Sequence, residues 1–263
     1  MKHINEKMTA KIEELRDRGA VFFINHSGGK DSQTQTLEIS RLVPADQIVI
    51  VHADLAEQDW DGAYDHLLAT APKGVKIIKC RSRRTFFQMV RDRGMWPSPK
   101  YRQCTSDLKR TPIEKIVRNE LKARGTLLAA NCMGIRAEES YTRAKQAPIR
   151  INNRLSKAGR EVWDLLPIHD FTTQEVFERI AAGGQRPHWI YHFLGRLSCV
   201  VCIFGSAKDI HTAAILEPDV FNEAVAIEKE IGHTVKIGQS LVEFASLHSG
   251  AGCKACDHWK EVA

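Results

Sequence analysis

A short glycine-rich segment at residues 27–32 constrains the fold most strongly, because it stands between a buried apolar run and a predicted helix. The preceding residues 21–24 read Val-Phe-Phe-Ile, which is typical of a buried strand. Residues 31–42 that follow are expected to form a helix. A strand that passes through a glycine turn into a helix is the opening unit of an α/β fold.

The same alternation continues along the chain. Further strands are predicted at 47–52, 75–79 and 126–131, where apolar and β-branched residues cluster. Helices are expected at 4–19, 60–71, 85–93 and 112–124. We therefore predict the α/β class, with a mainly parallel, doubly wound sheet and helices on both faces.

The pattern weakens beyond residue 140. Residues 145–160 are polar and basic, and they are expected to form a loop or an exposed hairpin. Helices are predicted at 172–182, 206–216 and 219–231. We therefore place one α/β domain at residues 1–206 and a helical, cysteine-bearing C-terminal extension at residues 207–263.

Composition narrows the class of protein. Of the 263 residues, 43% are hydrophobic and 27% are charged, which excludes a disordered or fibrous chain. The apolar runs are shorter than the roughly 18 residues of a membrane span, and the first residues are charged and unlike a signal peptide. We expect a cytoplasmic protein with no membrane partner. The 38 basic residues exceed the 32 acidic ones, which suits anionic ligands such as nucleotides or nucleic acid.

The glycine-rich segment has the composition of a phosphate-binding loop. Adjacent glycines let backbone amides approach a phosphate, and the helix N-terminus adds a partial positive charge. A lysine can neutralise phosphate oxygens, and serine hydroxyls can donate to them. The spacing is not that of a Walker A loop. The alternative is a turn that merely reverses the chain. The candidate nucleotide-binding residues here are Ser27, Gly28, Gly29, Lys30, Asp31 and Ser32.

This Ser-Gly-Gly-Lys-Asp-Ser string resembles the PP-loop of the adenine nucleotide alpha hydrolase superfamily, whose HUP-like fold binds the pyrophosphate or phosphosulfate part of an adenine nucleotide. Two later segments make the chain similar to the phosphoadenosine phosphosulfate (PAPS) reductase family. Residues 134–140 read Gly-Ile-Arg-Ala-Glu-Glu-Ser, and residues 166–176 match a Pro-Ile-x-Asp-x-Thr pattern that ends in valine. The resemblance covers about residues 21–206.

The resemblance implies roles for residues outside the loop. Arg136 would place a permanent cation on phosphate or sulfate oxygens of ATP or PAPS. Glu139 would orient Arg136 or hold Mg²⁺, and Asp54, after the second predicted strand, would contact the nucleotide or its metal. Lys30, Arg136 and Asp54 are thus the candidate catalytic residues. For Arg136, Glu139 and Asp54, a surface charge or a helix cap is the alternative.

Seven cysteines need a role in a chain expected in a reducing compartment, where clustered cysteines more often bind metal than form disulfides. Cys104, Cys199 and Cys202 come from two separated segments, and three thiolates can hold an iron–sulfur cluster. Family reductases with a four-iron (4Fe-4S) cluster resemble this pattern, but they carry a second cysteine where this chain has threonine. The fourth ligand is therefore open, with Cys253 and Cys256 as candidates.

Zinc is the rival interpretation of the cysteines. The pairs Cys199/Cys202 and Cys253/Cys256 could close a tetrahedral Zn²⁺ site. About 50 residues separate these pairs, against roughly 15–20 in the usual zinc-ribbon pattern. Cysteines that pack as small hydrophobic residues without a metal are a further alternative.

Two reactions are consistent with the resemblance. Family reductases that convert PAPS or its unphosphorylated analogue APS to sulfite keep a nucleophilic cysteine in a Glu-Cys-Gly-Leu-His tail, which is missing here. Another branch, which includes DNA phosphorothioation proteins, cleaves ATP to AMP and pyrophosphate, and pairs Cys-Thr with CxxC as this chain does. The sequence favours ATP cleavage coupled to sulfur transfer, with a sulfur-donor protein as partner and sulfonucleotide reduction as the alternative.

A nucleic-acid substrate would have a place to bind in the basic stretch at 143–160, whose cations could follow a phosphate backbone. A solvated loop is the alternative for this stretch. For the whole chain, a zinc-containing protein that binds a nucleotide or nucleic acid without catalysis is the second alternative.

Overall fold

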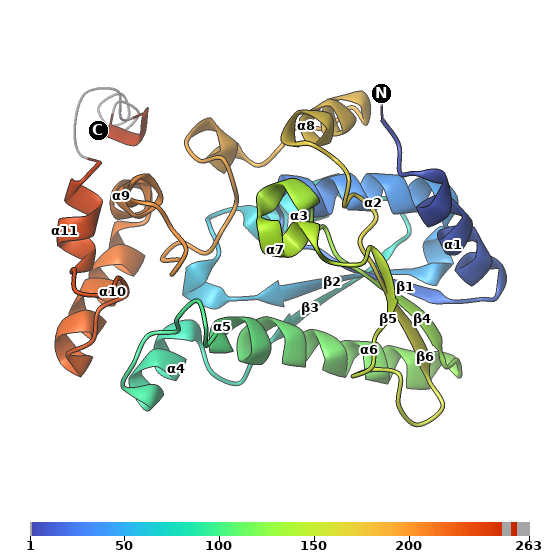
Figure 1. Ribbon diagram of the computed structural model, residues 1–263, viewed down its shortest axis with the longest axis horizontal. Coiled ribbons are helices and arrows are strands. Elements are labelled where there is room, and N and C mark those ends of the chain that lie inside the picture. Colours follow the sequence, from blue (N-terminus) through green and yellow to red (C-terminus); the bar gives the residue numbers. More distant parts are fainter. Residues whose placement is uncertain (1, 249–253, 257–263) are drawn as a thin grey trace. The chain divides into compact units, whose positions relative to one another are not determined.

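The computed structural model describes residues 2–248 and 254–256 (Figure 1). The chain forms two compact units, and each unit is assembled from segments that are separate in sequence. The first unit contains the residues up to Ala53, Gly62–Cys80 and Pro112–His188. The second unit contains Asp54–Asp61, Arg81–Thr111 and the residues from Trp189 onward.

The first unit is built on a six-stranded sheet with the order β3-β2-β1-β4-β6-β5. Strand β1 pairs in parallel with β2 and β4, β4 pairs in parallel with β6, and β5 is antiparallel to β6. The predicted mainly parallel α/β sheet is therefore confirmed. The strands are β1 Val21–Asn25, β2 Ile48–Asp54, β3 Lys76–Arg81, β4 Leu128–Cys132, β5 Ile149–Ile151 and β6 Glu161–Leu165.

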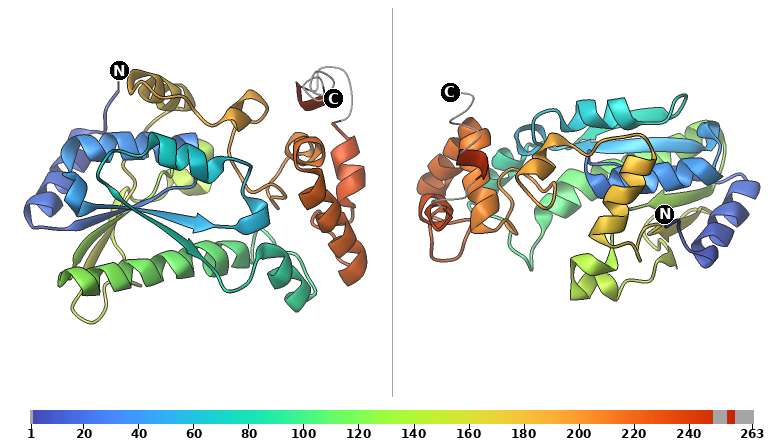
Figure 2. Two further views of the ribbon diagram at one scale, coloured as in Figure 1. Left: turned by 180° about the vertical axis from the view of Figure 1, so that it is seen from behind. Right: turned by 90° about the horizontal axis from the view of Figure 1, so that it is seen from above.

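Helices cover both faces of this sheet, because successive side chains of each strand point to opposite sides. Phe22 and Ile24 of β1 belong to one apolar cluster, whereas Val21 and Phe23 belong to another. The first cluster also holds residues of α1, α2 and α8, and the second holds residues of α6. Helices of this unit are α1 Glu6–Asp17, α2 Lys30–Leu42, α3 Ala63–Thr70, α6 Thr111–Arg124 (whose first residue belongs to the second unit), α7 Tyr141–Ala144 and α8 Thr173–Ala182 (Figure 2).

The second unit is mainly helical around one apolar core, to which Trp60, Phe87 and Ile227 contribute. It includes the expected C-terminal helices, but also residues 189–206 and two earlier segments, so this division differs from a boundary at residue 206. Its elements are α4 Phe86–Arg93, α5 Gln103–Thr105, a π-helical turn at Ser106–Arg110, α9 Ala207–Leu216, α10 Pro218–Ile231 and α11 Leu241–Ser246.

Strand β6 was not predicted from the sequence pattern. Its residues read Glu-Val-Trp-Asp-Leu, and the two acidic residues interrupt the apolar run that would indicate a strand. In the structure, β6 lies beside β4 in the sheet. It forms a hairpin with β5, and it lies beyond residues 145–160, for which a loop or an exposed hairpin was expected. Across the described part of the chain, no helix is both long and apolar enough to cross a bilayer.

Candidate functional site

The glycine-rich loop leaves the sheet where the strand order reverses. After β1 the chain continues to β2 and β3 on one side, and β4 and β6 lie on the other side of β1. Ligands of open α/β sheets bind at the carboxyl ends of the strands flanking such a point. Gly134 follows β4, and a Cβ atom there would lie 2.9 Å from the carbonyl carbon of Asp31. The loop after β1 and the segment after β4 therefore meet at this edge.

The loop is held by its own hydrogen bonds. Gly28 has a φ of +80°, and a Cβ atom there would lie 2.4 Å from the carbonyl oxygen of Ala63, so only glycine fits. The amide of Gly28 donates to Nδ1 of His26 at 3.0 Å. The hydroxyl of Ser32 donates to the carbonyl oxygen of Gly29 at 2.8 Å. These bonds fix the path of the backbone from the end of β1 into α2.

Two buried cations converge on one carboxylate at this edge. Nζ of Lys30 lies 2.8 Å from Oδ2 of Asp31, and Nε of Arg136 donates to Oδ1 of Asp31 at 2.7 Å. Lys30 is 2% exposed and Arg136 is 3% exposed. The structure thus brings together three of the residues that the sequence nominates, from the loop and from the segment after β4.

The guanidinium of Arg136 is oriented by a residue that the sequence analysis missed. Its Nη1 donates to Glu138 at 2.5 Å, and its Nη2 donates to the hydroxyl of Thr173 at 3.2 Å. Glu139 instead accepts from the backbone amide of Arg136 at 2.9 Å and pairs with Arg143. Adjacent glutamates are chemically identical, so nothing in the sequence distinguishes these two roles.

Asp54, at the end of β2, is paired within the second unit. Its Oδ2 accepts from Nε and Nη2 of Arg81 at 3.0 and 2.6 Å, and its Oδ1 accepts from the amide of Ala56 at 2.8 Å. This two-point ion pair accounts for the charge of the carboxylate. The partner Arg81 was not predicted.

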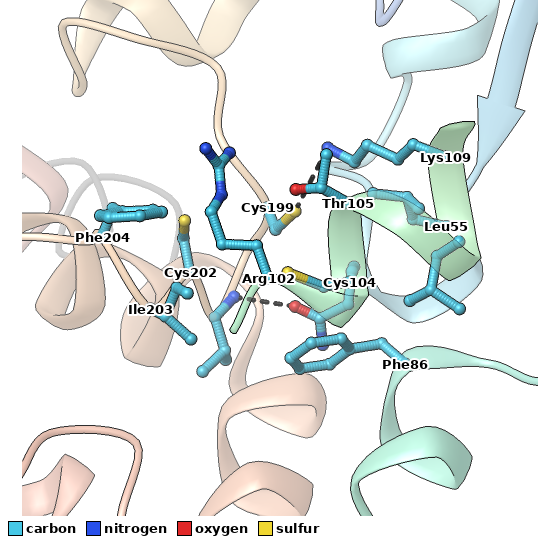
Figure 3. Close-up of a pocket in the computed structure, with 13 residues that line it drawn as sticks. Leu55, Phe86, Arg102, Cys104, Thr105, Lys109, Cys199, Cys202, Ile203 and Phe204 are labelled. Atoms are coloured by element: carbon cyan, nitrogen blue, oxygen red, sulfur yellow. Dashed lines mark hydrogen bonds between the residues drawn. The ribbon is translucent and has the colours of Figure 1, made fainter. Parts of the chain in front are cut away.

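The second unit contains a cavity of about 80 Å³ that three cysteines line (Figure 3). Cys104 comes from α5, whereas Cys199 and Cys202 come from the segment before α9. Nζ of Lys109 lies 3.8 Å from Sγ of Cys199. The side chain of Gln58 accepts from the amide of Val201 at 3.0 Å and so fixes the CxxC segment. The sequence-predicted thiols therefore share one cavity with a lysine.

Burial controls the protonation of these thiols. It raises the pKa of Cys104, and it raises the pKa of Cys199 to about 11, although the Lys109 cation acts in the opposite direction on both. The negative charge of Cys199 in its thiolate form in turn raises the pKa of Lys109. Within residues 2–248 and 254–256, no three His, Cys, Asp or Glu side chains form a preassembled metal site. The thiols share the cavity without being gathered around one point.

Of the two candidate fourth ligands, Cys256 lies among the described residues. Cys253 lies outside the described residues. Cys256 is not among the described residues that line the cavity, and its Sγ lies 3.1 Å from Nε2 of His211 on α9. Within the described residues, Cys256 therefore does not join Cys199 and Cys202 in lining the cavity.

Three of the six basic residues at 143–160 form ion pairs with acidic side chains. Arg143 pairs with Glu139, Arg150 with Asp164, and Arg154 with Glu114. A different basic surface adjoins the cysteine cavity, a groove of about 440 Å³ that shares two lining residues, Arg102 and Thr105, with the cavity. The other residues lining this groove are Lys100, Tyr101, Gln103, Ser106 and Arg110.

Comparison with protein families matches residues 22–199 to the phosphoadenosine phosphosulfate reductase domain, a span that includes the glycine-rich loop, Arg136 and two of the cavity cysteines. An uncharacterised protein of Methanocaldococcus jannaschii is 21% identical over 231 residues, which cover 84% of this chain and 51% of that protein. The chain thus spans about half the length of this relative. The crystal structure of Candida glabrata FMN adenylyltransferase aligns with a TM-score of 0.42 at 10% identity, covering 72% of this chain and 58% of that one.

Proposed function

Because the chain belongs to the phosphoadenosine phosphosulfate reductase domain family, we propose that it is an enzyme that cleaves ATP at the α-phosphate in a sulfur-transfer reaction. One observation carries the proposal. Lys30 and Arg136, both buried, meet at Asp31 on the carboxyl edge of the sheet, beside the glycine-rich loop. A buried pair of cations at the start of a helix is suited to a polyphosphate.

The chain's own groups define the proposed step. The first amides of α2 have no acceptor within the helix, so they can donate to phosphate oxygens. An oxygen of the acceptor attacks the α-phosphorus, the bond from that phosphorus to the pyrophosphate oxygen breaks, and the acceptor becomes adenylylated. Sulfur from the donor then attacks the activated acceptor and displaces AMP. The ammonium of Lys30 and the guanidinium of Arg136 stabilise the negative charge that gathers on the departing pyrophosphate.

Mg²⁺ fits this site mainly through the nucleotide. Asp54 is paired with Arg81, and Glu139 is paired with Arg143. Neither carboxylate offers an uncommitted charge for a cation, whereas nucleotide-bound Mg²⁺ usually keeps phosphate and water ligands. We therefore assign Mg²⁺ to the phosphates of ATP rather than to a protein cage.

The cysteine cavity is proposed to hold an iron–sulfur cluster of the 4Fe-4S type. Cys104, Cys199 and Cys202 provide the three thiols, and the lysine beside Cys199 offsets the negative charge of thiolates. When bound, such a cluster supplies iron that binds sulfur or transfers electrons. Because the described lining includes three cysteines, one iron would be left for a sulfur-bearing ligand from the proposed donor protein.

Metal analysis and product analysis test the proposal together. The protein is purified without oxygen, and its iron, sulfide and zinc contents are measured beside a visible spectrum. We expect about four irons per chain, loss of iron in Cys199→Ser, and unchanged iron in Cys132→Ser, which removes a buried thiol of the first unit. One zinc and no iron would contradict the cluster and would support the zinc alternative.

Release of AMP and pyrophosphate from ATP supports cleavage at the α-phosphate, and the absence of both products with every acceptor tried contradicts it.

Sulfonucleotide reduction is the second candidate, and the contact between Cys256 and His211 favours it. Burial, followed by the neighbouring His248, lowers the pKa of His211, so its imidazole is neutral and can accept a hydrogen bond from the thiol, although the lowered pKa makes it a weaker base. A thiolate formed there would attack the sulfur of PAPS or APS and break its bond to the bridging oxygen, which displaces the nucleotide and leaves an S-sulfonate on the cysteine. A second thiol, from an added dithiol reductant, would then release sulfite and form a disulfide. Formation of sulfite from either compound, lost in Cys256→Ser, would establish this reaction in place of ATP cleavage.

A nucleic acid is the proposed acceptor. The groove beside the cysteine cavity combines Lys100, Arg102 and Arg110 with Tyr101, a residue that is 59% exposed. Cations that follow a phosphate backbone and an aromatic ring that stacks on bases are the usual parts of a single-strand site. Binding of an oligonucleotide that weakens steeply with salt and is lost in Arg102→Ala together with Arg110→Ala would support it.

A further inference from the structure

His26 is buried at the end of β1, directly before the glycine-rich loop. The residue is 3% exposed, and its backbone amide donates to the carbonyl oxygen of Val51 in β2 at 3.0 Å. Its carbonyl oxygen lies 2.9 Å from Nδ1 of His52. The backbone of His26 is therefore anchored to β2, while its imidazole is directed into the loop.

The contacts of the imidazole fix its protonation. Nδ1 accepts the amide hydrogen of Gly28 at 3.0 Å, so this nitrogen carries a lone pair and the proton of the neutral ring lies on Nε2. Ser32 Oγ lies 3.3 Å from the same nitrogen, but its hydrogen is directed to the carbonyl oxygen of Gly29. A proton on Nδ1 would face the amide hydrogen of Gly28.

Other groups around the ring also favour its neutral form. His52 of β2 and His66 of α3 are the titratable side chains that act on His26, and a positive charge on either opposes another on this ring. Burial acts in the same direction and contributes most. The acceptor at Nδ1 is therefore present throughout the neutral pH range.

We infer that His26 is a positioning residue for the phosphate-binding loop, which uses the lone pair of Nδ1 to hold the amide of Gly28 and so to set the direction of the following amides. The left-handed conformation of Gly28 turns the chain, and the hydrogen bond to His26 keeps that turn closed. The amides of the next residues, at the start of α2, then point toward the phosphates of a nucleotide. This inference rests on the proposed nucleotide site.

Two amide substitutions separate the acceptor from the size of the ring. Asparagine places its side-chain oxygen close to the position of Nδ1, whereas glutamine places its oxygen nearer to that of Nε2. The experiment compares His26→Asn, His26→Gln and His26→Leu with the unaltered protein. Binding of an ATP analogue with a methylene bridge between the α- and β-phosphates is measured by calorimetry, and Tm is recorded for each protein.

We expect His26→Asn to bind the analogue within about threefold of the unaltered protein, and His26→Gln and His26→Leu to bind it about tenfold more weakly or worse, because the amide of Gly28 loses its acceptor. Equal affinity in all four proteins, or equal weakening in all three variants, would overturn the inference. If one variant does not fold, hydrogen exchange of the Gly28 amide is measured in the proteins that do. This exchange should be slow with histidine or asparagine at position 26 and fast with glutamine.

Failure of the proposed nucleotide site would look different. In that case the unaltered protein would bind neither the analogue nor pyrophosphate. The exchange rates of the Gly28 amide would still report whether His26 holds the loop, and fast exchange in the unaltered protein would overturn that part by itself.

Discussion

Asp31 is the residue on which the candidate nucleotide site is centred, because it accepts hydrogen bonds from Lys30 and Arg136 at once. A carboxylate between two buried cations keeps both in place and offsets part of the cost of burying their charges. The phosphates proposed to bind here carry the same sign of charge as this carboxylate. They would therefore find both cations already oriented.

Lys30→Ala is expected to lower pyrophosphate release from ATP by at least about a hundredfold, since it removes a cation that would stabilise the departing group. The fold should persist, because Asp31 keeps its bond to Arg136. Rates are measured by a pyrophosphate assay, with Lys122→Ala on the exposed side of α6 as the matched control. A Lys30→Ala protein that turns over at the normal rate would refute a catalytic role for this lysine.

Acid should destabilise the protein partly through His26. Burial, with His52 and His66, lowers the pKa of this residue from 6.5 to about 3, so below pH 6.5 the unfolded chain takes up a proton that the folded chain does not. The contribution of His26 to stability is complete above pH 6.5 and decreases as the pH falls toward 3, by at most about 1.4 kcal/mol per pH unit.

Urea unfolding at pH 7.5 and pH 5 measures this effect. The loss of unfolding free energy between these two values should be smaller in His26→Asn than in the unaltered protein, because asparagine does not titrate. The same loss in both proteins would contradict the assignment of the lowered pKa to His26.

Sequence reasoning at this scale identified residues whose type is tied to a motif, and it missed those chosen by tertiary contacts. The loop and Arg136 follow from their motifs. The roles of Glu138 and His26 do not follow from a motif. A glutamate or histidine one or two positions away would fit the sequence pattern equally well. The role of each depends on the partner that folding brings to it.

Among the elements, those with a regular apolar pattern were predictable. Strand β1 and helix α2 lie within one residue of their expected bounds, since a continuous apolar run and a glycine turn mark them. Strand β6 was missed because its acidic residues break the pattern. The π-helical turn at 106–110 has no sequence signature, because it depends on one extra residue within a helix.

This turn sets the angle between Cys104 and Lys109 around the helix. Deleting Asp107 should restore ordinary α-helical geometry, and this rotates Cys104 by about 100° relative to the residues that follow. We expect helix content to be retained and iron binding to be lost. Circular dichroism and iron analysis check both, with Asp107→Ala as the control that keeps the residue count. Normal iron content in the deletion variant would show that the turn does not place the cysteine.

On the scale of the whole molecule, the described chain passes from one unit to the other after residues 53, 61, 80, 111 and 188. A sequence pattern reports local periodicity, so it could indicate the α/β sheet but not which distant segments share a core. The residues that line the cysteine cavity all precede residue 206, yet Ile210, Ile227 and Leu241 of α9, α10 and α11 belong to the apolar core of the same unit.

A chain that ends at residue 206 is therefore expected to lose the folded second unit. Without α9, α10 and α11, the apolar residues of the other segments in that core lose much of their cover. The thiols of Cys104, Cys199 and Cys202 should then react rapidly with a thiol reagent, while Cys132, in a cluster of the first unit, stays protected. Mass spectrometry of labelled peptides measures each rate. Slow labelling of all four would show that residues 1–206 fold independently.

The repeated crossing between units has a consequence for inheritance. Because neither unit corresponds to one uninterrupted stretch of the gene, a single recombination event cannot exchange the cysteine-bearing unit for another while leaving the sheet intact. New chemistry in one unit must arise through point substitutions in a reading frame that it shares with the other. The two units are therefore expected to be inherited together.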